Sequence, residues 1–139
     1  MAFYFTTEDV EMPSFQQKEI QEWIQLIIKE YTKKAGDITY IFTSDEYLLK
    51  INQQYLQHDY YTDIITFDYS ENEIVSGDLF ISLDTVSSNA EKYNVAFLEE
   101  LHRVIIHGIL HLLGFNDKTE EENLQMRELE NSALGKLSC

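Results

Sequence analysis

The run H-G-I-L-H-L-L-G-F-N-D at residues 107–117 constrains this chain more than any other feature. His107 and His111 are four residues apart, so on a helix they lie on a single face, where both imidazoles can reach one metal ion. Gly114 is expected to end that helix in a left-handed cap and to turn the chain back toward it, with Asp117 three residues later. Two nitrogens and one carboxylate oxygen, with a fourth position free for water, are typical of a catalytic zinc site.

A purely structural role for the histidine pair is the alternative. Three of the four histidines lie between residues 102 and 111, and the side chains around the pair are strongly apolar. A buried imidazole in such surroundings needs a polar partner or a metal ion. The positions of Gly114 and Asp117 favour the metal, and we expect one zinc ion per chain, although a site of two histidines and one carboxylate also suits iron or nickel.

Length and composition indicate a single domain over residues 1–139. The sole cysteine is Cys139, so no internal disulfide is possible, and no apolar run is long enough to span a membrane. The first residues do not resemble a signal peptide, which together with the lone cysteine predicts a cytoplasmic protein. The 25 acidic residues outnumber the 10 lysines and arginines, and this net charge of −15, taken alone, argues against binding to nucleic acids.

Hydrophobic periodicity predicts an α+β fold, with about four strands in a mixed sheet and helices packed on it. The predicted strands are residues 2–6, 38–43, 63–69 and 77–83, the last two forming a hairpin. Helices are expected between residues 14 and 36, from 43 to 55, 84–93, 96–113 and from 119 onward. Three helix starts carry a capping-box pattern: Ser14 with Gln17, Thr43 with Glu46, and Thr119 with Glu122. Gly36 is expected to end the first helix, and the last is expected to bury Leu124, Leu129 and Leu134.

The residue after the first histidine limits the chemistry. Zinc proteases of the H-E-x-x-H type carry their general base there, whereas this chain has Gly108. The absence of that glutamate argues against a peptidase and for another hydrolysis, such as phosphodiester cleavage, in which His107 acts through a metal-bound water. The extended H-x3-H-x2-G-x2-D frame also resembles that of metzincin-like proteases, some of which use Asp as the third ligand.

Three ordered motifs resemble the YbeY family of rRNA-maturation metalloendoribonucleases. Residues 107–117 follow the family pattern H-G-x-L-H-L-x-G-[YF]-D-H. Residues 51–67 follow L-N-x-x-[YF]-R-x-K-D-x-P-T-D-V-L-S-F, and residues 77–81 follow the last five positions of L-G-D-I-x-I. The resemblance implies a zinc-dependent enzyme that cleaves single-stranded RNA, matures the 3′ end of 16S rRNA and takes part in ribosome quality control. Its partners would be rRNA and the small ribosomal subunit with its basic proteins.

The chain departs from the family pattern at several positions. The third ligand is Asp117 instead of histidine, and Leu56 replaces an arginine that is a natural phosphate clamp. His58 stands where the family has lysine and Tyr61 where it has proline, which leaves His58 as a candidate RNA contact. Arg103 precedes His107 by one turn on the same helix face and is a candidate substitute for the missing clamp; the alternative is that it forms a surface or supporting ion pair.

Some assignments remain open. Asp63 and Asp78 border predicted strands and could bond turn amides, while Asp78 could instead support a ligand histidine. The leading functional hypothesis is the metal-dependent endoribonuclease. The alternatives are a ribosome-assembly binding factor with a structural metal, favoured by the acidity and by Leu56, and a hydrolase of another bond.

Overall fold

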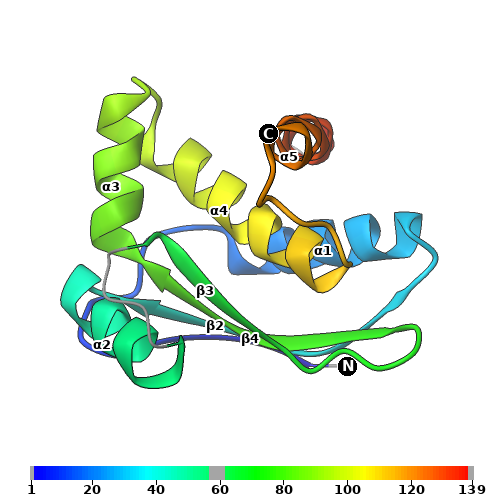
Figure 1. The fold of residues 1–139 in the computed structure, drawn as a ribbon, viewed down its shortest axis with the longest axis horizontal. Coiled ribbons are helices and arrows are strands. Elements are labelled where there is room, and N and C mark those ends of the chain that lie inside the picture. The colour runs from blue at the N-terminus through cyan, green and yellow to red at the C-terminus, as the bar shows by residue number, and fades with distance from the viewer. Residues whose placement is uncertain (1, 57–61, 138–139) are drawn as a thin grey trace.

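The computed structural model describes residues 2–56 and 62–137, which form one mixed sheet and five helices (Figure 1). The strands are β1 (Ala2–Thr7), β2 (Lys34–Thr43), β3 (Ile64–Asp68) and β4 (Ile74–Ser82). The helices are α1 (Gln17–Glu30), α2 (Asp45–Leu56), α3 (Leu83–Lys92), α4 (Phe97–Leu112) and α5 (Glu120–Leu134). This confirms the predicted α+β class, the four strands and the hairpin of the last two.

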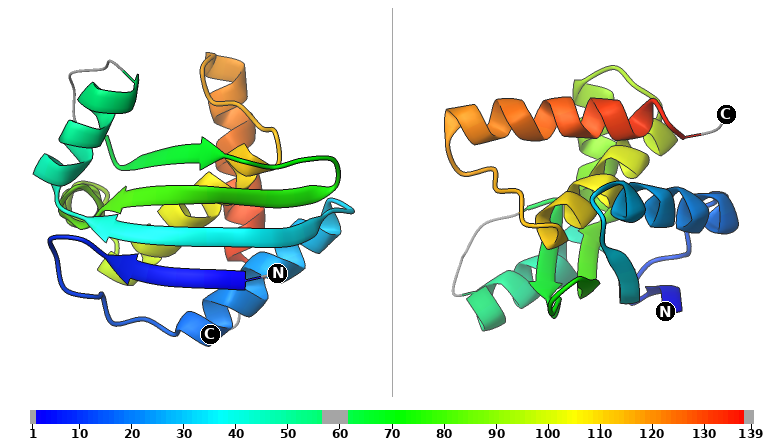
Figure 2. Two further views of the ribbon diagram at one scale, coloured as in Figure 1. Left: turned by 90° about the horizontal axis from the view of Figure 1, so that it is seen from below. Right: turned by 90° about the vertical axis from the view of Figure 1, so that its right-hand side faces the viewer.

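The sheet has the order β1-β2-β4-β3, seen face-on in the left panel of Figure 2. β1, β2 and β4 are parallel, and β3 pairs antiparallel with β4. α1 and α4 cover one face of the sheet, and α5 packs on α4 as a further layer (Figure 1). α2 lies on the other side of the sheet, against β3 and β4. The helix that carries the two histidines is therefore central, with strands beneath it and α5 above it.

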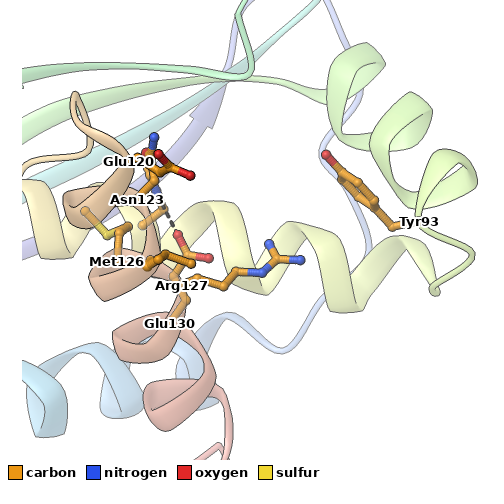
Figure 3. Close-up of a pocket in the computed structure, with 8 residues that line it drawn as sticks. Tyr93, Glu120, Asn123, Met126, Arg127 and Glu130 are labelled. Carbon is orange, nitrogen blue, oxygen red and sulfur yellow. Dashed lines mark hydrogen bonds and ion pairs between the residues drawn. The ribbon is translucent and has the colours of Figure 1, made fainter.

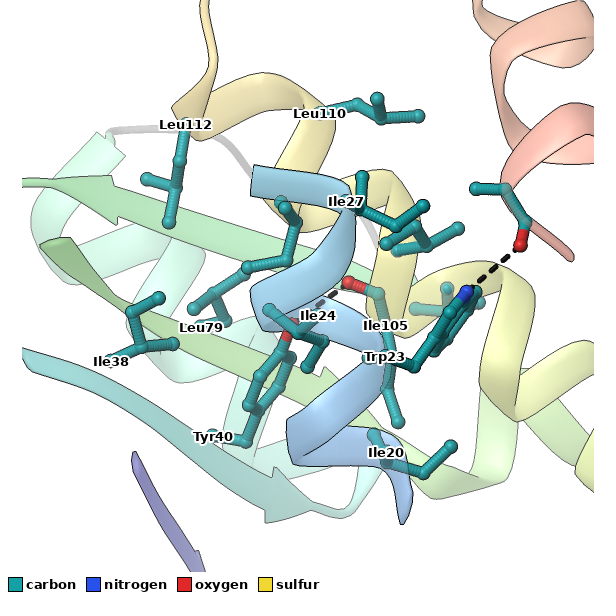
Figure 4. Close-up of a cluster of buried hydrophobic side chains, with 14 of the residues drawn as sticks. Ile20, Trp23, Ile24, Ile27, Ile38, Tyr40, Leu79, Ile105, Leu110 and Leu112 are labelled. Atoms are coloured by element: carbon teal, nitrogen blue, oxygen red, sulfur yellow. Dashed lines mark hydrogen bonds between the residues drawn. The ribbon is translucent and has the colours of Figure 1, made fainter. Parts of the chain in front are cut away.

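The core lies between the sheet and the helices α1 and α4 (Figure 4). Its largest fully buried side chains come from all of these elements: Ile20, Ile24, Ile27, Ile28, Ile38, Tyr40, Phe42, Leu79, Ile81, Leu101 and Ile105. Two buried polar groups are satisfied across the layers. The Tyr40 hydroxyl donates to the Ile105 carbonyl at 2.9 Å, and the Trp23 indole N–H donates to the Ala133 carbonyl at 2.8 Å. These bonds fix α4 to the sheet and α1 to α5.

Of the three predicted capping boxes, the structure forms one. α1 begins after Gln16 with no side-chain cap, so the predicted Ser14 cap is wrong. The Ser44 hydroxyl, one residue after the predicted Thr43, accepts the bond from the Tyr47 amide at 3.2 Å. The Thr119–Glu122 capping box of α5 is confirmed, with both reciprocal bonds formed.

Two further expectations are corrected. α1 ends at Glu30, and Thr32 takes the left-handed conformation with φ 59°, so Gly36 does not end the helix. Gly36 lies inside β2, at a register irregularity where an added Cβ would overlap the Ser76 side chain. Leu124 is 66 % exposed, and α5 instead turns Met126, Glu130 and Ala133 inward.

No helix in the described residues is long and apolar enough to cross a membrane.

Candidate metal centre

The two histidines project from the face of α4 that is not embedded in the core. Neighbouring residues on the other face, such as Ile105 and Ile109, are completely buried, while the side chains of His107 and His111 are 20 % and 27 % exposed. Their ring atoms Nε2 lie 3.1 Å apart. The spacing of four residues thus brings both imidazole nitrogens to one point at the edge of solvent.

A tight turn then returns the chain to this point. Leu113 caps α4, and Gly114 follows with φ +105°, a conformation that side chains rarely adopt. The amides of Gly114 and Phe115 bond back to the carbonyls of His111 and Leu110, which is the Schellman arrangement. This confirms the predicted glycine cap. The turn places Asp117 next to the two histidines.

The Oδ2 atom of Asp117 lies 3.2 Å from Nε2 of His107 and 3.3 Å from Nε2 of His111. The three atoms therefore form a nearly equilateral triangle with edges of 3.1 to 3.3 Å. Tetrahedral zinc ligands at about 2.0–2.1 Å from the ion lie about 3.3–3.4 Å from one another, so the triangle fits a transition metal with one open position. Within the described residues, these three are the group that could hold a metal ion.

Glu130 of α5 orients the first histidine. Its Oε2 atom accepts a hydrogen bond from Nδ1 of His107 at 2.6 Å, while its Oε1 atom is 2.8 Å from the Arg103 guanidinium. The bond places the proton of a neutral His107 ring on Nδ1 and leaves the Nε2 lone pair directed at Asp117 and His111. A carboxylate behind a ligand histidine is the usual support of a metal site, and it makes the imidazole a stronger donor.

For both His107 and Glu130, burial shifts the pKa in one direction and the neighbouring charges shift it in the other. Burial lowers the pKa of His107, but the hydrogen bond and the charge of Glu130, with smaller effects from Asp63 and Asp117, outweigh it and leave that pKa raised. Burial raises the pKa of Glu130, but the bonds from His107 and Arg103 dominate, and that pKa is lowered. Glu130 is therefore ionised at neutral pH despite its burial.

A cavity of about 560 Å3 opens beside the three ligands. Leu56 at the end of α2, Asp63 before β3 and Lys118 after the ligand turn line it together with His107, His111 and Asp117. Burial raises the pKa of the Asp63 carboxyl, with the nearby His107 partly opposing this. A carboxyl group with a raised pKa next to a metal site is suited to proton transfer.

Comparison with known proteins identifies the family of this chain. The sequence model of the family described as Endoribonuclease YbeY matches residues 3–138. The chain belongs to the YbeY family. A YbeY endoribonuclease of Parabacteroides distasonis is 58 % identical over 134 residues, which cover 96 % of this chain and 94 % of the relative. The relative from Azobacteroides pseudotrichonymphae is 57 % identical over 137 residues, 99 % of each chain.

A solved structure supports the same fold. The solution structure of a Thermotoga maritima protein superposes with a TM-score of 0.64 and 26 % sequence identity, covering 97 % of this chain and 91 % of that one. The resemblance on which the sequence analysis rested is therefore confirmed for the family and the fold. The assignment of individual site residues rests on the geometry of this chain.

Several candidates from the sequence can now be placed. Arg103 donates to Glu130 and to the Asn131 side chain, both at 2.8 Å, which is the supporting ion pair left open as its alternative role. Asp78 bonds the Tyr69 hydroxyl and lies on the sheet face opposite α4, so it does not support a ligand histidine. Asp63 bonds local amides, as its structural interpretation predicted, but also lines the cavity. His58 and Tyr61 lie outside the described residues.

Gly108 has a packing role, whereas the sequence indicated only that a catalytic glutamate is absent there. A Cβ atom on Gly108 would overlap the Leu79 side chain on β4 and lie 2.8 Å from Cδ1 of Ile64. The glycine lets α4 approach the sheet closely, and a glutamate there would not fit. This YbeY-family chain therefore cannot place a protease-type base after its first histidine.

Glu130 is the residue that the sequence analysis missed. A signal was available, because Glu130 shares the inward face of α5 with Met126 and Ala133, and a glutamate is almost never buried without a partner. The partner could not be identified from spacing, since His107 is 23 residues away in the chain.

Proposed function

We propose that this chain is a zinc-dependent endoribonuclease that hydrolyses single-stranded RNA during rRNA processing, with one metal ion held by His107, His111 and Asp117. The convergence of these three ligand atoms within 3.3 Å, in a chain of the YbeY endoribonuclease family, is the observation that supports it. A zinc ion bound there would supply a Lewis acid and an activated water for phosphodiester hydrolysis.

The residues of the chain divide the remaining tasks. His107 and His111 hold the metal from a rigid helix, and Glu130 keeps the His107 ring in the required tautomer. Asp63 lines the same cavity and, with its raised pKa, accepts a proton from the attacking water and can return it to the leaving oxygen. Lys118, also in the cavity wall, attracts the phosphate backbone. These roles complete the site without a catalytic base at position 108.

The wider role follows from the family resemblance and belongs to the same proposal. The substrate is the precursor of 16S rRNA at its 3′ end, met on the small ribosomal subunit in the cytoplasm, and the same cleavage serves ribosome quality control. The acidic surface of the chain, with a net charge of −15, suits docking to the basic proteins of that subunit.

Metal content and cleavage test the proposal together. Protein purified without added metal is analysed by elemental mass spectrometry and incubated with a single-stranded oligoribonucleotide, before and after chelation. We expect about one zinc per chain and cleavage that disappears with the chelator and returns with zinc. Asp117→Ala should lose both, whereas Asp37→Ala, which alters an exposed aspartate on β2, should lose neither. A wild-type chain that binds no metal and cleaves no RNA would overturn the proposal.

One observation favours a second candidate, a ribosome-assembly factor that binds without cutting. Leu56 stands in place of the family arginine and lines the wall of the metal-site cavity, where a phosphate clamp is missing. Leu56→Arg separates the two functions: if the missing clamp limits catalysis, RNA cleavage should rise several-fold. His107→Ala should abolish cleavage by an enzyme but leave ribosome association of a binding factor mostly intact, provided circular dichroism shows that the variant is folded.

A further inference from the structure

A second cavity, between Tyr93 and α5 (Figure 3), shares His107 with the cavity of the metal centre. Its volume is about 410 Å3, within the range of small-molecule sites. One wall is a face of α5, on which Glu120, Asn123 and Arg127 follow each other at intervals of three and four residues. The other wall is Tyr93, the residue that ends α3. Because His107 lines both cavities, they are neighbours.

Arg127 supplies this cavity with a cation. The chain has only two arginines, and the guanidinium of Arg103 is bonded to Glu130 and Asn131. Across the part of the chain that the structure describes, Arg127 forms no ion pair within 4 Å; its side chain extends from α5 toward Tyr93, as Figure 3 shows. The carboxylate of Glu100 interacts with Arg127 through charge but forms no ion pair with it in the described residues. A guanidinium without an ion-pair partner is suited to bind phosphate.

Tyr93 supplies an aromatic surface with two cations near it. It is 50 % exposed, the guanidinium carbon of Arg127 lies 6.0 Å from its ring centre, and Nζ of Lys92 lies 5.5 Å from it. Proteins that bind single-stranded nucleic acid combine cations that follow the backbone with aromatic rings on which unpaired bases stack. In a chain with a net charge of −15, Lys92 and Arg127 bring two cations to a cavity that Glu120 and Glu130 also line.

We propose that this cavity is a nucleotide subsite, in which a base next to the scissile phosphate stacks on Tyr93 while Arg127 binds the adjoining phosphate. The inference rests on the proposed function and specifies how the substrate is held. It also gives a physical reason for a preference for single strands, because a base within a duplex is already stacked and paired and cannot reach the ring.

Steady-state cleavage of a single-stranded oligoribonucleotide by the zinc-loaded full chain tests the subsite. Tyr93→Ala should raise KM about tenfold through lost stacking, while Tyr93→Phe, which keeps the ring, should remain within about twofold of wild type. Arg127→Gln should raise KM about fivefold and reduce the salt dependence of kcat/KM by roughly one phosphate contact. Because neither side chain reaches the metal ligands, kcat should stay within about twofold.

Lys18→Gln, which removes an exposed cation from the far helix α1, is the matched charge control. If the KM values of Tyr93→Ala and Arg127→Gln equal that of the control, the subsite is overturned while the proposed function stands. If the zinc-loaded wild-type chain neither binds nor cleaves the oligonucleotide, the proposed function fails and the subsite fails with it. Circular dichroism of each variant ensures that a changed KM does not reflect unfolding.

Discussion

Glu130→Gln should weaken zinc binding although it alters no metal ligand. The carboxylate side chain is 7 % exposed and bonds Nδ1 of His107 at 2.6 Å and the guanidinium of Arg103 at 2.8 Å. A glutamine that accepts from His107 must direct its own N–H groups at Arg103, so one of the two bonds is lost. Loss of such a supporting partner reduces metal affinity by about 10- to 100-fold, equivalent to roughly 1.4–2.7 kcal/mol. We expect the upper part of this range, because the group is buried.

The loss of zinc affinity in Glu130→Gln should be larger at high pH than at low pH. A proton competes with the metal for Nε2 of His107, and Glu130 raises the pKa of that ring. Wild-type affinity therefore begins to fall at a higher pH than the affinity of the variant, whose His107 has a lower pKa. The advantage of the wild type should be largest at about pH 8 and should narrow as the pH falls through the raised pKa of His107.

Competition with a fluorescent zinc chelator measures both effects, at about pH 8 and pH 6. Glu128→Gln, which removes the same charge from an exposed position of α5, is the control and should match wild type. An affinity of Glu130→Gln within twofold of wild type at pH 8, or a difference that widens on acidification, would refute the assigned role of Glu130.

Three other substitutions test packing and buried charge, each by urea unfolding. Gly108→Ala places a methyl group against Leu79 and should cost about 1–3 kcal/mol. Asp63→Asn removes a carboxyl whose pKa burial raises; because its ionised form destabilises the fold, the metal-free variant should be more stable at pH 7, a gain that vanishes as pH falls through that pKa. Tyr40→Phe loses the bond to Ile105 and should cost about 1 kcal/mol. Burial raises the pKa of Tyr40, so only wild type should lose stability from this group above about pH 10. A urea midpoint of Gly108→Ala equal to that of wild type would contradict the packing role. A stability difference from wild type that does not change with pH, for Asp63→Asn or Tyr40→Phe, would contradict the assigned pKa directions.

The metal-ligand segment, residues 107–117, could be predicted from the sequence because its geometry is local. The spacing of His107 and His111 fixes their relative position on any helix, and Gly114 determines how the chain leaves it. The same locality explains why the β3–β4 hairpin and the capping box of α5 were found. Each of these features depends on residues that follow one another closely in the chain.

The errors arise where a residue responds to a distant part of the chain. Gly36 looked like a helix end, but its role depends on Ser76 of a neighbouring strand. Gly108 looked like a missing catalytic base, but its role depends on Leu79 beneath α4. Glu130 could be identified as an anomaly on an apolar face, yet its function depends on His107. Tertiary packing decides all three, and no periodicity in the sequence encodes it.

The acidity of the chain can be reconciled with RNA as a substrate through the metal ion. Asp117, Glu130 and Asp63 concentrate carboxyl groups around the ligands, and Arg103 neutralises only part of this charge. A metal-free site therefore repels phosphate, whereas a divalent cation reverses the local balance. We therefore expect RNA binding to depend on metal binding, and thermodynamic linkage then requires RNA to strengthen metal binding by the same factor. A net charge of −15 thus argues against unspecific attachment to nucleic acid but not against cleavage at one metal-loaded site.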